Sequence, residues 1–465
     1  MPRVEATDEH ERKLDAPDGF ELPDLGGSPL EPRVFTSVYY DVPERSLSDA
    51  GLTLRRRTER GLSVWQLKLP LADSRLELEE PGGPAGPPEQ LRRLLVAHLR
   101  DRTLEPIAEL RTHRRGALVS RNGSTAEVTI DEVAVMDAMR VAEEFVEIEI
   151  ELRTGDPAQL DRIAKEVSRA GARPTDGTPK VFRALRMQTG AKKKQPSEPF
   201  DALRSLLRIQ LIEILRHDPG TRLGTDPESL HDMRVAVRRS RALLRAGRKL
   251  IASDTQLLNA ELQWLGTVLG AVRDLDVLLA RLRSEAAELG GDDEKAALRL
   301  LRSLTREHKR ARTALLKALD GERYLALLDR FEQELSALEP TGADVSLSSL
   351  ARREVKKLRE AVLALPPDPA DDELHALRKL GKRARYASEL AGHATVVRRA
   401  KQFQDVLGEH QDAVVAQERI RTLAAGAPAA EAIAAGRLLE REEARRAAAR
   451  TAWADAWKQL DRAKR

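Results

Sequence analysis

Hydrophobic and polar residues alternate through much of the first 190 positions of the chain. The clearest alternating segments are VWQLKLPL (64–71), RLELEE (75–80), TAEVTIDEV (125–133) and FVEIEIEL (145–152). A period of two is typical of strands that bury one face and expose the other. Gly and Pro in PGGPAGPP (81–88) predict a loop, and helical spacing predicts helices over 90–100 and 157–171. We therefore expect a sheet with flanking helices.

From about residue 200 the apolar positions recur with the period of a helix. Leu203, Leu206 and Leu207 share one stripe, and Asp226-Pro227-Glu228 is typical of a helix start, with a capping carboxylate and Pro in the first turn. The segment TGAKKKQPSEPF (189–200) separates the two patterns and reads as a linker. The predicted domains are 1–190 and 200–465, joined by a linker over 191–199.

The helical half contains a sequence repeat. HDMRVAVRRSRALL (231–244) matches HALRKLGKRARYAS (375–388), WLGTVLGAVRDLD (264–276) matches FQDVLGEHQDA (403–413), and REHKRARTALLKAL (306–319) matches REEARRAAARTAWA (441–454). The matches follow the same order, which predicts two copies of a four-helix unit, over about 200–340 and 346–465. The expected fold class is α+β with two domains.

Composition excludes several kinds of protein. The chain has 79 Lys plus Arg and 75 Asp plus Glu, a net charge of +4, so any strongly basic face must be local. It has no cysteine, which excludes disulfides, thiolate catalysis and Cys-ligated metals. Aromatic residues make up 3%, which disfavours stacking platforms for nucleic acid. No apolar run is long enough for a membrane helix and no apolar signal segment is seen at the N-terminus, so we expect a soluble cytoplasmic protein.

Acidic residues alternate in two of the expected strands. EHERK contains Glu9, Glu11 and Lys13, and VEIEIEL contains Glu147, Glu149 and Glu151. Alternate residues of a strand share a face, and like charges on one face repel unless they have a partner. A hard divalent cation such as Mg²⁺ takes carboxylate oxygens as ligands, so these acids are candidate metal ligands.

Basic residues lie on the strands between them. Arg55 and Arg57 alternate in LTLRRR, and Lys68 faces opposite Trp65 by parity. Guanidinium groups match phosphate oxygens. A closed antiparallel barrel lined by these acids and bases would bind a metal and an oligophosphate. The alternative is that each strand carries its charges on a solvated face as weak salt bridges.

These residues resemble the CYTH domain, the family of triphosphate tunnel metalloenzymes. The resemblance begins at the Glu9-x-Glu11-x-Lys13 signature and continues through Tyr39-Tyr40-Asp41, Gly51-Leu52-x-Leu54-Arg55-x-Arg57, Lys68, Asp131, Glu149-x-Glu151 and Lys180. It implies a tunnel that holds a triphosphate with Mg²⁺ or Mn²⁺. By position, the implied metal ligands are Glu9, Glu11, Glu149 and Glu151, and the implied phosphate ligands are Lys13, Arg55, Arg57, Lys68, Arg114 and Lys180.

Phosphoryl transfer needs charge neutralisation and a positioned water rather than covalent chemistry. We therefore expect hydrolysis of inorganic triphosphate or a related triphosphate, with Glu9, Glu11 and Lys13 as catalytic residues. Cyclic nucleotide formation and a tunnel that only binds stay open as alternatives. Two positions depart from the family pattern, because Pro179 replaces the usual Ser before Lys180 and the segment TIDEV lacks the Gly that often follows Asp131.

Cations form a stripe on one helix in each copy of the helical repeat. His231, Arg234, Arg238, Arg241 and Arg245 follow one another at spacings of 3, 4, 3 and 4, and His375, Arg378, Lys382 and Arg385 repeat the stripe. The two sets of cations that match between the copies are His231, Arg234, Arg238, Arg239 and Arg241 in the first copy, and His375, Arg378, Lys382, Arg383 and Arg385 in the second. Like charges at these spacings repel, so each stripe needs nearby acids or a bound anion. A solvated face laced with salt bridges is the alternative for a single helix. Two facing stripes would form one basic groove.

These stripes resemble the CHAD domain over roughly 200–465, and the resemblance implies that both sets bind inorganic polyphosphate. The leading hypothesis is a triphosphatase joined to a polyphosphate-binding module, which would allow association with polyphosphate granules. The alternative is a non-catalytic polyphosphate-binding or granule-targeting protein. The near-neutral net charge and the lack of a docking motif disfavour nucleic acid as a partner, and no amphipathic helix stands apart to favour a membrane surface.

Overall fold

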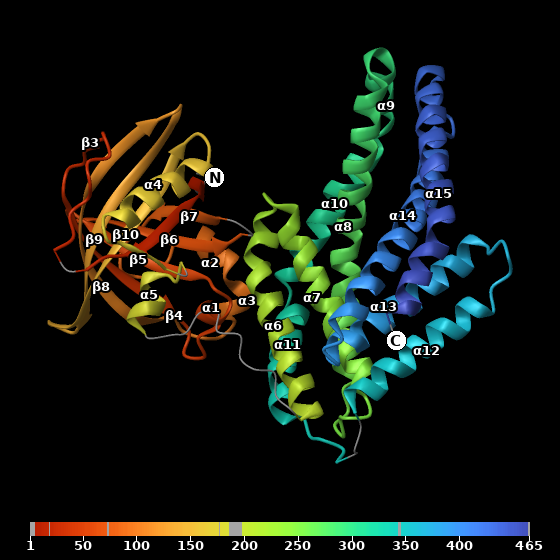
Figure 1. Ribbon diagram of the computed structural model, residues 1–465, viewed down its shortest axis with the longest axis horizontal. Coiled ribbons are helices and arrows are strands. Elements are labelled where there is room, and N and C mark those ends of the chain that lie inside the picture. The colour runs from red at the N-terminus through yellow and green to blue at the C-terminus, as the bar shows by residue number, and fades with distance from the viewer. Residues whose placement is uncertain are drawn as a thin grey trace. The chain divides into compact units, whose positions relative to one another are not determined.

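The computed structural model describes residues 5–17, 19–71, 74–175, 177–185, 198–342 and 346–463 (Figure 1). The chain forms two compact units. Unit 1 contains the described residues up to 185 together with Leu215–Leu223, and unit 2 contains the remaining residues from 198 onward. Most of the predicted linker 191–199 lies outside the described residues, so its boundaries stay a prediction.

Unit 1 is one antiparallel sheet with short helices. Its strands are β1 (Glu5–Glu9), β2 (Glu11–Asp15), β3 (Ser28–Pro29), β4 (Arg33–Asp41), β5 (Thr53–Glu59), β6 (Leu62–Pro70), β7 (Arg75–Pro81), β8 (Glu105–Arg121), β9 (Ser124–Asp137), β10 (Arg140–Thr154) and β11 (Arg173–Pro174). Its helices are α1 (Ser46–Asp49), α2 (Glu89–Leu94), α3 (Val96–Leu99), α4 (Ala158–Arg169) and α5 (Lys180–Ala184). The strand order is β1-β7-β6-β5-β4-β8-β9-β10-β2-β11, and β3 pairs with β8.

The sheet is not closed by hydrogen bonds, so the predicted closed barrel is not confirmed. β1 pairs with β7 and β2 pairs with β10, and only His10 separates β1 from β2. The backbone therefore passes from one end of the sheet to the other at His10. Within the described ranges, no ladder joins β2 to β7.

The apolar face of the sheet is covered by helices. On β10, Ile148 and Ile150 pack against Leu160 and Ile163 of α4 (Figure 1), while on β6 the buried Trp65 belongs to a cluster that includes residues of α1 and α2. Side chains alternate across a strand, so the charged residues between these apolar ones point to the opposite face. The inner face of the curved sheet is therefore the polar one.

Unit 2 is helical. Its helices are α6 (Pro199–Leu223, whose last nine residues belong to unit 1), α7 (Pro227–Ala246), α8 (Gln256–Leu289), α9 (Gly291–Leu300), α10 (Arg302–Leu319), α11 (Glu322–Ala337), α12 (Leu347–Leu363), α13 (Asp371–Leu390), α14 (Ala394–Ala424) and α15 (Ala429–Arg462). The second repeat has the four predicted helices. The described residues of the first predicted repeat contain six helices, and the four-helix unit stays a prediction.

Local sequence explains where several of these helices begin and end. The carboxylate of Asp226 accepts hydrogen bonds from the backbone of Glu228 and Ser229 and caps α7 as predicted. Gly290 and Gly291 adopt positive φ values of 68° and 57° and end α8. No helix in the described part of the chain is long and apolar enough to cross a membrane.

Candidate functional site

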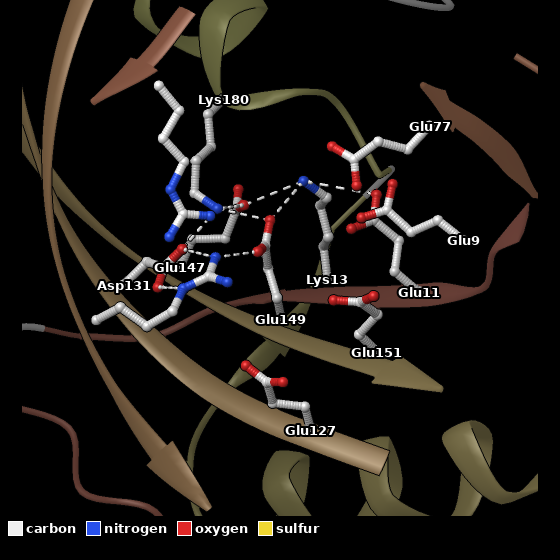
Figure 2. Close-up of polar contacts among 12 residues, drawn as sticks. Glu9, Glu11, Lys13, Glu77, Glu127, Asp131, Glu147, Glu149, Glu151 and Lys180 are labelled. Carbon is white, nitrogen blue, oxygen red and sulfur yellow. Dashed lines mark hydrogen bonds and ion pairs between the residues drawn. The ribbon is translucent and has the colours of Figure 1, made fainter. Parts of the chain in front are cut away.

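The structure brings the predicted residues of the N-terminal site into one charged cavity of about 250 Å³ (Figure 2). The predicted residues that line this charged cavity are Glu9, Glu11, Lys13, Arg55, Arg57, Lys68, Arg114, Glu149, Glu151 and Lys180. They come from β1, β2, β5, β6, β8, β10 and α5. The alternative of charges scattered over separate solvated faces does not describe this arrangement.

Strand register explains why these side chains meet. Lys13 lies opposite Glu149, and Glu11 lies opposite Glu151, in the ladder between β2 and β10. Lys68 lies opposite Glu77 in the ladder between β6 and β7. Directly opposed residues point to the same side of a sheet and lie close together, so the alternation within each strand becomes a single charged surface.

Glu149 is the centre of the ion-pair network at one end of the charged cavity. Its carboxylate lies 2.9 Å from Lys13 Nζ, 2.5 Å from Lys180 Nζ and 2.6 Å from Arg114 Nη2 (Figure 2). Burial would raise the pKa of Glu149, but these three cations hold it well below its usual range. The same acids raise the pKa of Lys13 against the effect of its burial.

Two fully buried acids lie behind this network. Arg114 donates two hydrogen bonds to Asp131, at 2.7 and 2.6 Å, and Lys180 Nζ lies 2.8 Å from the same carboxylate. Glu147 lies 3.3 Å from Lys13 and 3.2 Å from Lys180. These acids neutralise and fix the cations that face the charged cavity.

The cations at the other end are fixed in the same way. Lys68 Nζ lies 2.6 and 2.7 Å from the two oxygens of Glu9. Arg55 donates to Gln66 at 2.6 Å and to the hydroxyl of Tyr39 at 3.1 Å. Arg57 stacks on the ring of Phe35, 3.9 Å from its centroid, and pairs with Glu59.

Glu151 is the acid of the charged cavity whose pKa is raised. Burial, together with the charges of Glu9 and Glu149, raises its pKa to about 7, although Arg153 and Lys68 act in the opposite direction. A carboxylate in this setting gains from an additional cation.

The donor chemistry of the charged cavity fits a hard divalent metal. Glu9, Glu11, Glu149 and Glu151 all present oxygen to the cavity, and oxygen is what Mg²⁺ and Mn²⁺ prefer. In the described ranges, however, no three His, Asp or Glu side chains are grouped closely enough to hold a metal ion. Lys13 and Lys68 occupy the carboxylates instead.

The departure at Pro179 leaves Lys180 in the cavity. Pro179 directly precedes α5, with a φ of −58°, a value that proline favours, and Lys180 is the first residue of the helix. Both residues line the charged cavity.

Several residues of the cavity wall were not predicted as site residues. These are Arg33, Tyr39, Thr53, Gln66, Arg75, Glu77, Glu79, Arg153 and Pro179. Three of them, Arg75, Glu77 and Glu79, alternate within the predicted strand RLELEE. Their alternation within that strand was the available signal, and the structure places Arg75 opposite Glu9.

The basic stripes of unit 2 lie on α7 and α13, which pack together. Between these helices and α12 is a groove of about 670 Å³. The cations that line this basic groove are Arg238, Arg241, Arg245, Arg248, Lys249, Arg353, Lys357, Lys379, Lys382 and Arg383, and the acid among its lining residues is Glu354. Four of the ten predicted polyphosphate ligands, Arg238, Arg241, Lys382 and Arg383, are therefore in the groove wall, and α12 contributes cations that the repeat did not reveal.

The other six predicted polyphosphate ligands do not line the basic groove. They are His231, Arg234, Arg239, His375, Arg378 and Arg385. Arg234 and Arg378 occupy equivalent positions in the two repeats, packed against Gly270 and Gly408. Arg234 also pairs with Asp274 at 2.8 Å.

Lys382 is the groove cation with the most perturbed ionisation. Burial, and then the neighbouring guanidinium groups of Arg378 and Arg238, lower its pKa to about 8. Arg238 is held in place by a hydrogen bond from its Nε to the hydroxyl of Tyr386, at 2.8 Å. The groove therefore concentrates positive charge with little acid to offset it.

Comparison with known proteins agrees with both parts of the chain. The CYTH domain family matches residues 8–180 and the CHAD domain family matches residues 205–421. An uncharacterized protein from Mycobacterium tuberculosis is 30% identical over 484 residues, which cover 95% of this chain and 94% of that protein. Among solved structures, PptA from Streptomyces chartreusis is 28% identical and matches 56% of this chain and 99% of its own, with a TM-score of 0.48. The CHAD domain from the plant Ricinus communis is 27% identical and matches 59% of this chain and 95% of its own, with a TM-score of 0.49.

Both resemblances noted in the sequence are thus confirmed as family membership. CYTH family members act as triphosphatases or cyclases and generally depend on a metal. The chain belongs to the family of proteins in which a CYTH domain is followed by a CHAD domain.

Proposed function

We propose that unit 1 is a metal-dependent triphosphatase that hydrolyses inorganic triphosphate or a related triphosphate. The observation that carries this proposal is the charged cavity, where acids and bases from eight strands and α5 face one another in a space of about 250 Å³. Its cations match the charge of a short phosphate chain, and its acids match a hard metal ion.

The residues divide into two roles. Arg55, Arg57 and Lys68 would hold the outer phosphate oxygens and neutralise the charge that develops during transfer. Lys13 and Lys180 would move from their carboxylates to the phosphate, because a polyanion offers them a second partner. Tyr39 and Gln66 keep Arg55 in its position.

Glu9, Glu11, Glu149 and Glu151 would hold Mg²⁺ or Mn²⁺, which supplies charge neutralisation and a more acidic bound water. A water molecule would be the attacking group, because phosphoryl transfer requires no covalent intermediate on the protein.

Release of phosphate from triphosphate, measured with Mg²⁺ or Mn²⁺, tests the proposal. We expect release by the wild-type chain, and a loss of at least about a hundredfold in the Glu9→Gln, Glu11→Gln double variant, because removal of one electrostatic contact already costs about that much in well-studied enzymes. Equal release by both proteins would reject the proposal. ATP and thiamine triphosphate in the same assay would identify the preferred triphosphate.

We also propose that the basic groove of unit 2 binds inorganic polyphosphate. Ten cations and one acid line it, which favours a linear polyanion. Competition between long-chain polyphosphate and duplex DNA at matched salt tests this, since both would bind more weakly as salt rises. Stronger binding of DNA would contradict the proposal.

The second candidate is a non-catalytic protein whose two sites both act as phosphate receptors. The observation that favours it is that Lys13 and Lys68 occupy the carboxylates that a metal would need. Binding of triphosphate without metal-dependent release would support this candidate.

A further inference from the structure

A second cavity adjoins the charged cavity where the sheet is open between β2 and β7. This side pocket has a volume of about 710 Å³ and is lined by residues of β1, β2, β7, β11 and α4, with adjoining loop residues. Its wall includes Arg12, Ser74, Arg75, Lys165 and Ser168.

The side pocket reaches around the edge of β2. Arg12 and Leu14 point away from the charged cavity, since Arg12 bonds to Asp161 on α4 at 2.7 Å and Leu14 packs in the cluster beneath α4. Glu11 and Lys13 point into the charged cavity. Residues from both faces of β2 line the side pocket, so the pocket must pass the edge of that strand.

This edge of β2 is partly free of a neighbouring strand. β11 pairs only with Leu14 and Asp15 on that side, and in the described ranges no strand pairs with Glu11 there. The residues that line both cavities are Glu9, Glu11, Lys13 and Arg75. The two spaces therefore meet at these four side chains.

Arg75 differs from the other cations at this junction. Lys13, Arg55, Arg57, Lys68, Arg114, Arg153, Arg33 and Lys180 each pair with an acid. Among the described cations that line the charged cavity, Arg75 alone has no ion pair or side-chain hydrogen bond. Lys165, exposed on the α4 wall of the side pocket, has no acidic partner within the described residues either. Unpaired cations on the two walls favour an anion between them.

We propose that the side pocket is an anion site that receives inorganic phosphate leaving the charged cavity, with Arg75 and Lys165 as its cationic groups. This inference rests on the proposed triphosphatase function. Hydrolysis adds one water across a phosphoanhydride bond and yields orthophosphate and diphosphate, both anions. They must leave a cavity lined with cations, and Arg75 offers the first partner on the way out.

Because the chain has no cysteine, one introduced thiol can report on the side pocket. Ser168→Cys adds a thiol to its α4 wall with little change in size, and Ser120→Cys, exposed on β8 and outside both cavities, is the matched control. The rate of labelling by the anionic reagent 2-sulfonatoethyl methanethiosulfonate is measured with orthophosphate, and with sodium chloride at equal ionic strength.

We expect orthophosphate at twice its dissociation constant to slow the labelling of Ser168→Cys by about threefold, with no effect on Ser120→Cys. Arg75→Gln should remove this protection, whereas Arg140→Gln, an exposed arginine at the start of β10, should keep it. Labelling of Ser168→Cys at the same rate with and without orthophosphate would overturn the proposal.

The exit role has its own readout. A bulky thiol label on Ser168→Cys should lower kcat for triphosphate several-fold and leave KM unchanged, and an unchanged kcat would overturn the exit role. Protection by orthophosphate in a protein that releases no phosphate from triphosphate would instead count against the proposed function and leave the anion site standing.

Discussion

At the scale of single residues, the charged cavity depends on buried acids that share their cations. Asp131 is fully buried, and its partners are Arg114 and Lys180. Without Asp131 each cation would lose one of its acidic partners, and a buried charge is costly when its pairing is incomplete. Asp131 therefore acts on the site through the two cations it holds.

Arg114→Gln should destabilise unit 1. The change leaves the buried carboxylate of Asp131 with one cation in place of two, and breaking a buried pair costs about 3 kcal/mol. Urea denaturation measures the loss. Adding Asp131→Asn should restore part of the stability, because the two losses are coupled; a double variant as unstable as the sum of both single variants would contradict this.

Metal binding should depend on pH through Glu151. Its pKa is raised to about 7 by burial and by Glu9 and Glu149, so below pH 7 a proton competes with the metal. We expect Mn²⁺ affinity, measured by titration, to fall by up to about tenfold per pH unit below 7. Glu151→Gln should bind more weakly and lose this dependence, and an equally steep dependence in that variant would exclude Glu151.

The same residue has an opposite effect on folding in the absence of metal. Its pKa is higher in the folded state than in the unfolded state, so the folded state binds the extra proton between about pH 4.5 and 7. The contribution of Glu151 to stability is therefore present at low pH and is lost as pH rises through 7.

Residue parity was readable from the sequence, but pairing was not. The alternation around Trp65 and Lys68 correctly separates the helix-covered face from the cavity face. That Lys13 meets Glu149, and Lys68 meets Glu9, depends on strands far apart in the sequence and on their register. The same holds for Arg75, which lies opposite Glu9 only through the register of β1 and β7.

At the scale of elements, the basic groove belongs to three helices rather than to the two stripes alone. α12 contributes Arg353 and Lys357 to its wall. The stripe pattern predicted that α7 and α13 would face each other, since both carry the same motif. It could not identify α12, because α12 does not carry the repeated motif and its position beside the groove depends on how the helices pack.

Substitutions on α7 and α13 test whether polyphosphate binds to the cations that line the groove or to all cations of the repeated motif. Arg238→Gln with Lys382→Gln should weaken binding of long-chain polyphosphate by about tenfold or more, and lower its dependence on salt, because two cations leave the groove. Arg239→Gln with Arg385→Gln, on the same two helices but outside the groove wall, is the matched control. Calorimetric titration measures both, and equal losses would show that the motif matters more than the groove.

The open edge of the sheet is also a property of elements. The alternating segments predicted the strands but could not show which two strands would stay unpaired. Closure of a sheet depends on the stagger and tilt of its strands, and alternation within one strand contains no information on either. Here β1 pairs with β7 and β2 pairs with β10, at opposite ends of the sheet. The side pocket lies at the gap beside β2.

At the scale of the whole molecule, the change from strand to helix periodicity correctly separated two kinds of fold. The assignment of residues to compact units is less simple, because Leu215–Leu223 belongs to unit 1. Periodicity assigns these residues to a helix and contains no information about which core that helix packs on.

A fragment that ends at residue 190 should therefore be less stable than one that ends at residue 225. The longer fragment keeps the carbonyl of Leu215, which accepts a hydrogen bond from Nε2 of the fully buried His98 at 3.0 Å, and keeps Leu223 packed against the cluster around Trp65. Burial lowers the pKa of His98 to about 4, so the ring is neutral and its N–H needs this acceptor. Loss of such a partner costs about 1–3 kcal/mol, which corresponds to a fall in Tm of roughly 3 °C or more for a unit of this size. Thermal melts of the two fragments measure the difference. Equal melting temperatures would show that residues 1–190 contain everything the sheet requires.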